Sequence, residues 1–107
     1  MTTDVGLVIY GTSGNIFNVK KALELSGAKV RIIEQSSDFT KVDKIVLPGV
    51  GCFKNAMEHI QPLESALIEA IDNVPTLGIC LGMQLLAKVG FEYGETKGLG
   101  IIDAEVK

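Results

Sequence analysis

The sequence is poor in the residues that build cross-linked or metal-bound folds. Its 107 residues include two cysteines, one histidine and no tryptophan. Two cysteines are too few for a disulfide framework, and a single histidine leaves no Cys/His set at zinc-ligand spacing. We therefore predict neither a disulfide-stapled fold nor a metal site, expect no cofactor, and expect at least one reactive thiol.

Long apolar runs and clusters of positive charge are also missing. The longest uninterrupted apolar stretches are only a few residues, whereas a helix needs about 20 to cross a bilayer. Ten basic and thirteen acidic residues give a net charge of −3, with no run of Lys or Arg to neutralise a phosphate backbone. The N-terminal MTTD lacks the order of a signal peptide. We predict a cytoplasmic protein that binds neither nucleic acid nor membrane.

Hydrophobic residues make up 47% of the chain, enough to fill the interior of a single domain over residues 1–107. Apolar runs closed by Gly or Pro predict strands over residues 5–10, 29–33, 44–47 and 76–79. One-sided apolar stripes predict helices that open at Gly14 and Asn15, run from Leu63 to Pro75, and span Gly82 to Val89. This alternation predicts a three-layer α/β fold, a mostly parallel sheet with helices on both faces.

The last residues alternate between apolar and charged side chains. Residues 102, 104 and 106 are apolar, and residues 103, 105 and 107 are charged. The chain thus stops inside a predicted strand, which natural domains rarely do, so we expect it to be truncated. An unpaired strand edge and an uncovered apolar face predict self-association into a two-fold homodimer.

The clearest chemical signal is the sequence Gly78-Ile79-Cys80-Leu81-Gly82. It lies between a predicted buried strand and a predicted apolar helix, which is the arrangement of a nucleophile elbow with Cys in place of Ser. Flanking side chains would clash in such a turn, and the N-terminus of the following helix favours the thiolate form of Cys80. The Leu81 amide is then a natural oxyanion donor. The alternative is that Cys80 is a small buried hydrophobic residue at a strand end.

A second signal is Leu47-Pro48-Gly49-Val50-Gly51, which follows the strand over residues 44–47. Neighbouring parallel strands place their following loops at one edge of the sheet, so this loop is expected to face Cys80. Its glycines let the backbone approach a substrate and present a second amide to an oxyanion. Alone, the segment indicates only a turn.

Together these segments carry a resemblance to a known family. The sequence LPGVGCFKNAM, followed by PTLGICLGMQLL and KGLGII, resembles the class I glutamine amidotransferases, whose fold is flavodoxin-like. The opening YGTSGN is similar to the family's Y-G-x-G-N turn with one residue more. Within the family, the chain resembles glutaminase subunits of imidazole glycerol phosphate synthase, from histidine biosynthesis. The resemblance implies that glutamine is the substrate and that ammonia passes to a partner synthase (cyclase) subunit.

The resemblance also implies roles for particular residues. Cys80 would attack the side-chain amide of glutamine and form a thioester that water hydrolyses. The amides of Leu81 and of Val50 or Gly51 would stabilise the oxyanion. Gly49, Gly51 and Gln84 would contact the glutamine, and Glu92 would lie near its α-amino group. With the oxyanion donors, the predicted contacts of the site are Gly49, Val50, Gly51, Leu81, Gln84 and Glu92.

Other features depart from the family pattern. Cys52 is interpreted as a filler beneath the glycine loop, and His59 as a surface residue rather than a base. The family's His, followed two residues later by Glu, has no counterpart, so this chain alone is expected to be inactive. Three interpretations remain open: the N-terminal part of a glutaminase, a catalytically silent module that binds a partner, or an engineered half of such a fold.

Overall fold

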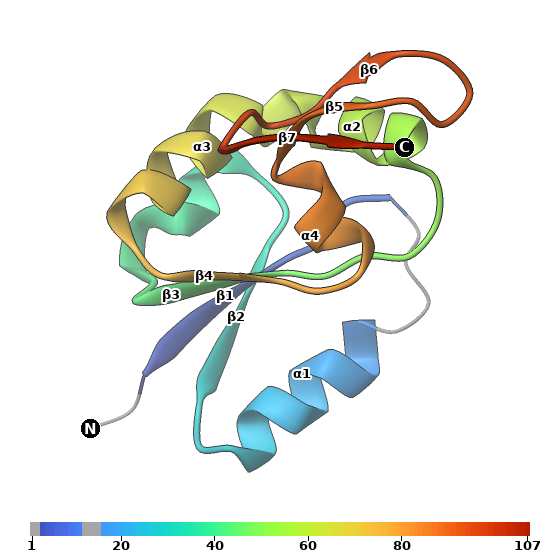
Figure 1. Ribbon diagram of the computed structural model, residues 1–107. Helices are drawn as coiled ribbons and strands as arrows, with labels where there is room; N and C mark the ends of the chain where they lie inside the picture. Colours follow the sequence, from blue (N-terminus) through green and yellow to red (C-terminus); the bar gives the residue numbers. More distant parts are fainter. Residues whose placement is uncertain (1–2, 12–15) are drawn as a thin grey trace.

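A four-stranded parallel sheet forms the centre of the molecule (Figure 1). A computed structural model of the chain describes residues 3–11 and 16–107. The sheet has the order β2-β1-β3-β4 and comprises β1 (Asp4–Val8), β2 (Lys29–Ile33), β3 (Lys44–Leu47) and β4 (Thr76–Gly78). Because all four strands are parallel, the segments that follow β1, β3 and β4 meet at one edge of the sheet.

Helices lie on both faces of this sheet, in three layers (Figure 1). Helix α1 (Ile16–Leu25) covers one face. The other face carries α2 (Phe53–Ile60), η2 (Gln61–Leu63) and α3 (Glu64–Asn73), with η1 (Ser36–Lys41) before β3. In the described part of the chain no helix is long and apolar enough to span a membrane.

Successive side chains of β3 point to opposite faces of the central sheet, and a separate hydrophobic core lies on each face. Val46 points toward α1 and is buried there with Val5 and Leu7. Ile45 and Leu47 point the opposite way and are buried in the larger core under α2 and α3. Successive strand residues face opposite sides of a sheet, so a strand buried on both faces needs a continuous apolar run, which KIVL supplies after its lysine.

A second, smaller sheet lies on the α2 and α3 side of the molecule (Figure 1). It has the order β6-β5-β7 and comprises β5 (Ala87–Gly90), β6 (Thr96–Lys97) and β7 (Ile102–Val106). Phe53, the first residue of α2, is only 1% exposed, and both Gly90 and Gly98 approach its ring. The ring joins this sheet to the main core.

The predicted fold class and the main strands are confirmed. Strands β2 and β3 have the predicted bounds, while β1 and β4 end two and one residues before the predicted ends. Helix α3 matches the predicted stripe and ends before Pro75. The predicted helix start at Gly14 and Asn15 lies outside the described residues.

The prediction of a helix over Gly82 to Val89 is wrong. Helix α4 spans only Leu81–Leu85, and Ala87–Gly90 form strand β5. The reason is tertiary: β5 is the central strand of the small sheet, pairing with β6 on one side and β7 on the other. These ladders outweigh the weak helical preference of a short apolar stretch that contains Val89 and ends at Gly90.

Candidate active site

Cys80 occupies a sharp turn between β4 and α4. Its backbone has φ 52° and ψ −119°, one of two non-glycine residues with positive φ in the described part of the chain. A non-glycine residue held in such a conformation costs about 1–3 kcal/mol and persists only where the surroundings enforce it. The Cys80 carbonyl accepts the amides of Met83 (3.0 Å) and Gln84 (3.2 Å), and the residue itself is exposed. The turn therefore presents the thiol outward from a rigid strand and helix.

The two glycines of the motif are required by close backbone contacts. A Cβ atom on Gly82 would collide with the carbonyl oxygen of Leu47 and lie 2.9 Å from that of Pro48. A Cβ on Gly78 would lie 2.7 Å from the Cα of Met83. The predicted reason for the G-x-C-x-G spacing, that flanking side chains would clash, is confirmed.

The loop Pro48–Gly51 lies beside Cys80, as the parallel topology predicts. Strands β3 and β4 pair Leu47 with Gly78, and the Ile79 amide donates to the Leu47 carbonyl at 2.9 Å. Two residues further along each segment, the Leu81 amide donates to the Gly49 carbonyl at 3.2 Å. The predicted oxyanion donor Leu81 thus has a protein acceptor, and an oxyanion there has to displace the Gly49 carbonyl.

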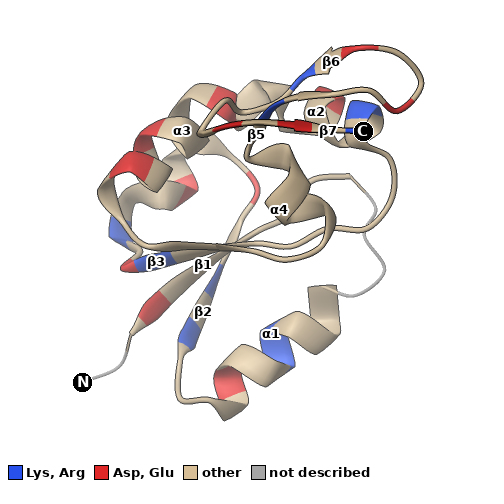
Figure 2. Ribbon diagram, in the orientation of Figure 1, with Lys and Arg blue, Asp and Glu red and all other residues tan. Residues whose placement is uncertain are grey.

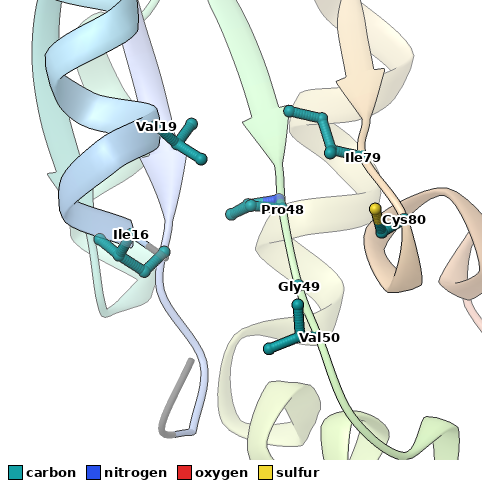
Figure 3. A pocket seen from close by; sticks show the side chains of 7 residues that line it. All are labelled: Ile16, Val19, Pro48, Gly49, Val50, Ile79 and Cys80. Atoms are coloured by element: carbon teal, nitrogen blue, oxygen red, sulfur yellow. The ribbon is translucent and has the colours of Figure 1, made fainter. Parts of the chain in front are cut away.

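A cavity of about 120 Å³ opens next to the thiol. It lies between α1 and the ends of β3 and β4, and Figure 3 shows α1 side chains facing the Pro48–Gly51 loop across it. A second cavity of about 210 Å³ lies at the other end of the loop, and Val50 lines both. The first is lined by Ile16, Val19, Pro48, Gly49, Val50, Ile79 and Cys80, and the second by Tyr10, Gly11, Val50, Gly51, Cys52, Asn55, Ala56 and His59.

Charged side chains lie away from the Cys80 turn. Figure 2 shows Lys, Arg, Asp and Glu on α1, α2 and α3, on strands of the central sheet and on the small sheet, while α4 carries none. Among the residues that the structure describes, no Asp, Glu, Lys or Arg lines either of the two cavities. The described surroundings of the thiol are therefore backbone amides, carbonyls and apolar side chains.

The motif and the geometry agree with one family profile. The profile described as "Glutamine amidotransferase class-I" matches residues 7–97 of the chain. The chain belongs to the class I glutamine amidotransferase family. The matched range includes the β1 end, the Pro48–Gly51 loop and the Cys80 turn, so each segment described above falls within the amidotransferase match.

Curated relatives refine the placement within the amidotransferases. The chain is 43% identical over 107 residues to "Imidazole glycerol phosphate synthase subunit HisH" of Wolinella succinogenes, covering 95% of this chain and 51% of that protein. It is 45% identical over 103 residues to the protein of the same name in Methanocaldococcus jannaschii, covering 95% and 52%. The chain thus spans about half the length of the curated relatives it matches.

A solved structure supports the fold independently of close sequence similarity. The crystal structure of a glutamine amidotransferase superposes with a TM-score of 0.78 at 21% sequence identity. The match covers 94% of this chain and 54% of that one. At this identity the likeness concerns the α/β architecture.

The predicted site residues of this amidotransferase chain do not all gather at the thiol. Gly49 and Val50 line the cavity beside Cys80, and Gly51 lines the second cavity. Gln84 is exposed on α4 and lines neither of these two cavities. The carboxylate of Glu92 accepts the Phe53 amide at 3.1 Å, so it caps the start of α2.

The two residues interpreted as bystanders lie in the second cavity. Cys52 is half-buried at the residue before α2. His59 is exposed, and its Nδ1 lies 2.8 Å from the Asn55 carbonyl oxygen one turn earlier on α2. The single histidine of the sequence thus lines a different cavity from the one beside Cys80.

Sequence reasoning missed one polar residue at the site, Tyr10. Its hydroxyl donates to the Pro48 carbonyl, and the side chain is 8% exposed. Burial raises the pKa of Tyr10 to about 12. The available signal was a tyrosine at the end of an otherwise aliphatic run, since a buried tyrosine hydroxyl usually finds a hydrogen-bond partner.

Proposed function

We propose that the chain is the nucleophile-bearing part of a glutaminase that releases ammonia from glutamine. The observation that carries this proposal is Cys80, held at positive φ between two glycines and beside a cavity, in an amidotransferase fold. Strain at a turn between a strand and a helix is typical of an exposed nucleophile. Residues 1–107 then represent the N-terminal part of a glutaminase-like domain.

The proposed chemistry is acyl transfer through a thioester. The Cys80 thiolate attacks the side-chain carbonyl carbon of glutamine, forming a C–S bond and an oxyanion. The carbonyl re-forms as the C–N bond breaks, and the nitrogen takes a proton and leaves as ammonia. Water then attacks the thioester, which releases glutamate and regenerates the thiol.

The surrounding backbone supplies the proposed electrostatic support. The amide of Leu81 and that of Val50 or Gly51 stabilise the oxyanion, once the Gly49 carbonyl has left the Leu81 amide. Gly49 and Gly51 allow close approach of the substrate. Gln84 and Glu92 are proposed to contact the glutamine, which for Glu92 requires release of the Phe53 amide.

The proposed acceptor of the ammonia is a synthase subunit. The curated relatives are named subunits of imidazole glycerol phosphate synthase, which supports a cyclase partner and a place in histidine biosynthesis. Among the described residues, His59 lines the second cavity, and the lining of the cavity beside Cys80 includes no Asp, Glu or His to act as a base. We place the protein in the cytoplasm, where thiols stay reduced.

A glutamine-like electrophile tests this function directly. Diazo-oxo-norleucine is expected to add once per chain, at Cys80, because the thiol is exposed and adjoins the cavity. Peptide mapping by mass spectrometry locates the adduct. Cys80→Ser is expected to abolish it, Cys52→Ser to leave it unchanged, and excess glutamine to slow it.

The outcome also separates the glutaminase from a catalytically silent scaffold. Labelling of Cys80 that glutamine does not slow would mean a reactive thiol without a substrate site. A folded protein that is modified only at Cys52, or not at all, would contradict the proposal. Circular dichroism confirms that each variant is folded.

We also propose that two copies of the chain associate. Within the described residues, β7 pairs only with β5 and β4 pairs only with β3. Ile102 is 48% exposed and Leu77 is 57% exposed on these strands. Pairing of open edges satisfies backbone groups and removes apolar area from water at roughly 25 cal/mol per Å².

Light scattering at several concentrations is expected to show a mass that doubles as concentration rises. Ile102→Lys and Leu77→Lys then identify which edge is used, because the charge disrupts only the edge that carries it. A constant monomer mass over the whole range would contradict the dimer. The predicted apolar face is only partly uncovered, since Ile101 and Val106 pack against the larger core.

A further inference from the structure

Tyr10 connects the end of β1 to the loop that adjoins the nucleophile. The residue follows β1 by two positions, is almost fully buried, and belongs to the larger core. Its hydroxyl donates to the Pro48 carbonyl, which is 38 positions away in the sequence. The buried hydroxyl and the buried carbonyl satisfy each other's hydrogen-bonding capacity, so removal of the hydroxyl would leave the carbonyl without this donor.

The hydrogen bond from Tyr10 to Pro48 lies one peptide before the Gly49 carbonyl, which accepts the amide of the predicted oxyanion donor Leu81. The Pro48 carbonyl is held by Tyr10, and the next carbonyl, that of Gly49, accepts the Leu81 amide at 3.2 Å. Gly49 also lies directly against Tyr10, because a Cβ atom on it would collide with the tyrosine hydroxyl and lie 3.4 Å from the Leu81 Cβ. Tyr10, the loop and the nucleophile turn therefore form one continuous set of contacts.

We propose that Tyr10 is a positioning residue of this site: its hydroxyl fixes the Pro48 carbonyl and so holds the following Gly49–Val50 peptide in register with the Cys80 turn. The chemical part of this inference rests on the proposed acyl transfer at Cys80. With Pro48 fixed, a peptide rotation that frees the Leu81 amide is confined to the Gly49–Val50 unit. Without the hydroxyl, the Pro48 carbonyl turns to find another donor and displaces Gly49 with it.

The environment of Tyr10 keeps it a hydrogen-bond donor. Burial raises the pKa of Tyr10 to about 12, so the hydroxyl retains its proton throughout the physiological range. The hydroxyl donates to the Pro48 carbonyl and lies against Gly49, and the titratable residues that line the same cavity as Tyr10 are Cys52 and His59. The Tyr10 hydroxyl can therefore donate to the Pro48 carbonyl throughout the physiological pH range, and this hydrogen bond is the anchor of the loop.

Tyr10→Phe removes the hydroxyl and retains the ring that fills the core. Tyr93→Phe is the matched control, because Tyr93 is 81% exposed and carries the only other tyrosine hydroxyl of the sequence. Two reactions of Cys80 are compared in each protein. The p-nitrophenyl γ-ester of glutamate acylates the thiol through an oxyanion and releases p-nitrophenolate, whereas iodoacetamide alkylates it by displacement of iodide without an oxyanion.

The expected result is a selective loss in Tyr10→Phe. Its p-nitrophenolate burst is about tenfold slower, because the displaced Gly49–Val50 peptide no longer holds its own amide in register with the Cys80 turn, while iodoacetamide alkylation changes less than twofold. Tyr93→Phe leaves both rates at the wild-type values. Equal slowing of both reactions, or of neither, would overturn the positioning role.

Amide hydrogen exchange tests the anchor without any substrate. The Leu81 amide is expected to exchange about tenfold faster in Tyr10→Phe, while the Ile79 amide, bonded to Leu47, keeps its rate. An unchanged Leu81 exchange rate would overturn the proposal. If the wild-type chain gives no burst, the acyl-transfer function fails, and the Leu81 exchange rate still decides whether Tyr10 holds the loop.

Discussion

Glutamine is expected to yield no sustained ammonia from the 107-residue chain, although Cys80 accepts a glutamyl group from an activated ester. The reason is the leaving group. A p-nitrophenolate leaves without help, whereas the nitrogen of an amide must be protonated as its bond to carbon breaks. In the Ser-His-Asp template, loss of the histidine alone costs about 10⁶ in kcat.

The position of His59 makes this prediction specific to the structure. It is the only histidine of the sequence, its Nδ1 lies 2.8 Å from the Asn55 carbonyl oxygen, and it lines the cavity away from Cys80. Ammonia release is followed by a coupled glutamate dehydrogenase assay, beside the p-nitrophenolate burst. The expected pattern is a burst of one equivalent that Cys80→Ser abolishes, with no glutamine turnover.

A second variant distinguishes the two sources of a base. His59→Ala is expected to leave both the burst and the absence of turnover unchanged. Sustained turnover that disappears in His59→Ala would show that this histidine reaches the thiol and would contradict the assignment. Turnover that persists in His59→Ala and rises with the square of the protein concentration would instead indicate a base from a second copy.

The central sheet was predictable because each of its strands carries its own signal. β1 and β3 each carry an apolar run after their first residue, which is typical of a strand buried in a parallel sheet, and β2 carries a shorter one interrupted by Arg31. Topology then follows from the crossovers, and topology places the segments after β3 and β4 side by side. The meeting of the Pro48–Gly51 loop with Cys80 is therefore predictable without coordinates.

The small sheet was not predictable from local pattern. Residues 82–89 have the apolar spacing of a helix, and only the pairing of β5 with β6 and β7 turns their second half into a strand. Both partners lie later in the chain, beyond a loop that contains Gly94. The periodicity of a segment says nothing about a ladder whose other strands are distant in sequence.

Individual contacts at the site were also beyond sequence reasoning. Leu81 was predicted as an oxyanion donor from its place after the nucleophile, but its bond to the Gly49 carbonyl depends on the orientation of one peptide. Glu92 was assigned to the substrate by resemblance, and its carboxylate instead lies on the Phe53 amide. Residue type and spacing predict that an amide or a carboxylate lies near a site. Which hydrogen-bond partner it has depends on rotations about single bonds, which the sequence does not reveal.

The same distinction explains why the glycines of the elbow were predictable. A glycine requirement comes from backbone atoms, and backbone positions follow from the strand–turn–helix arrangement itself. Leu47 ends β3 next to the turn, so its carbonyl oxygen lies against the first residues of α4 regardless of side-chain detail. We therefore expect the largest loss of folding stability from a substitution at Gly82.

Gly82→Ala is expected to lower the free energy of unfolding by about 3 kcal/mol, the upper part of the range for overpacking a core. The added Cβ would collide with the Leu47 carbonyl and lie 2.9 Å from the Pro48 carbonyl, and neither can move without distorting β3 or the loop. Helix propensity has the opposite sign, since Gly→Ala inside a helix stabilises by about 1 kcal/mol.

Met83→Ala is the matched control, because Met83 is the next residue of α4 and is 57% exposed. Its effect is expected to stay within about 0.5 kcal/mol, as for most surface substitutions. Urea denaturation followed by circular dichroism measures both variants, and diazo-oxo-norleucine labelling of Cys80 in native Gly82→Ala reports whether the displaced turn still presents the thiol. Because propensity and collision act in opposite directions, a Gly82→Ala protein as stable as wild type would mean that α4 does not lie against the Leu47 carbonyl, and the close approach that shapes the Cys80 turn would be wrong.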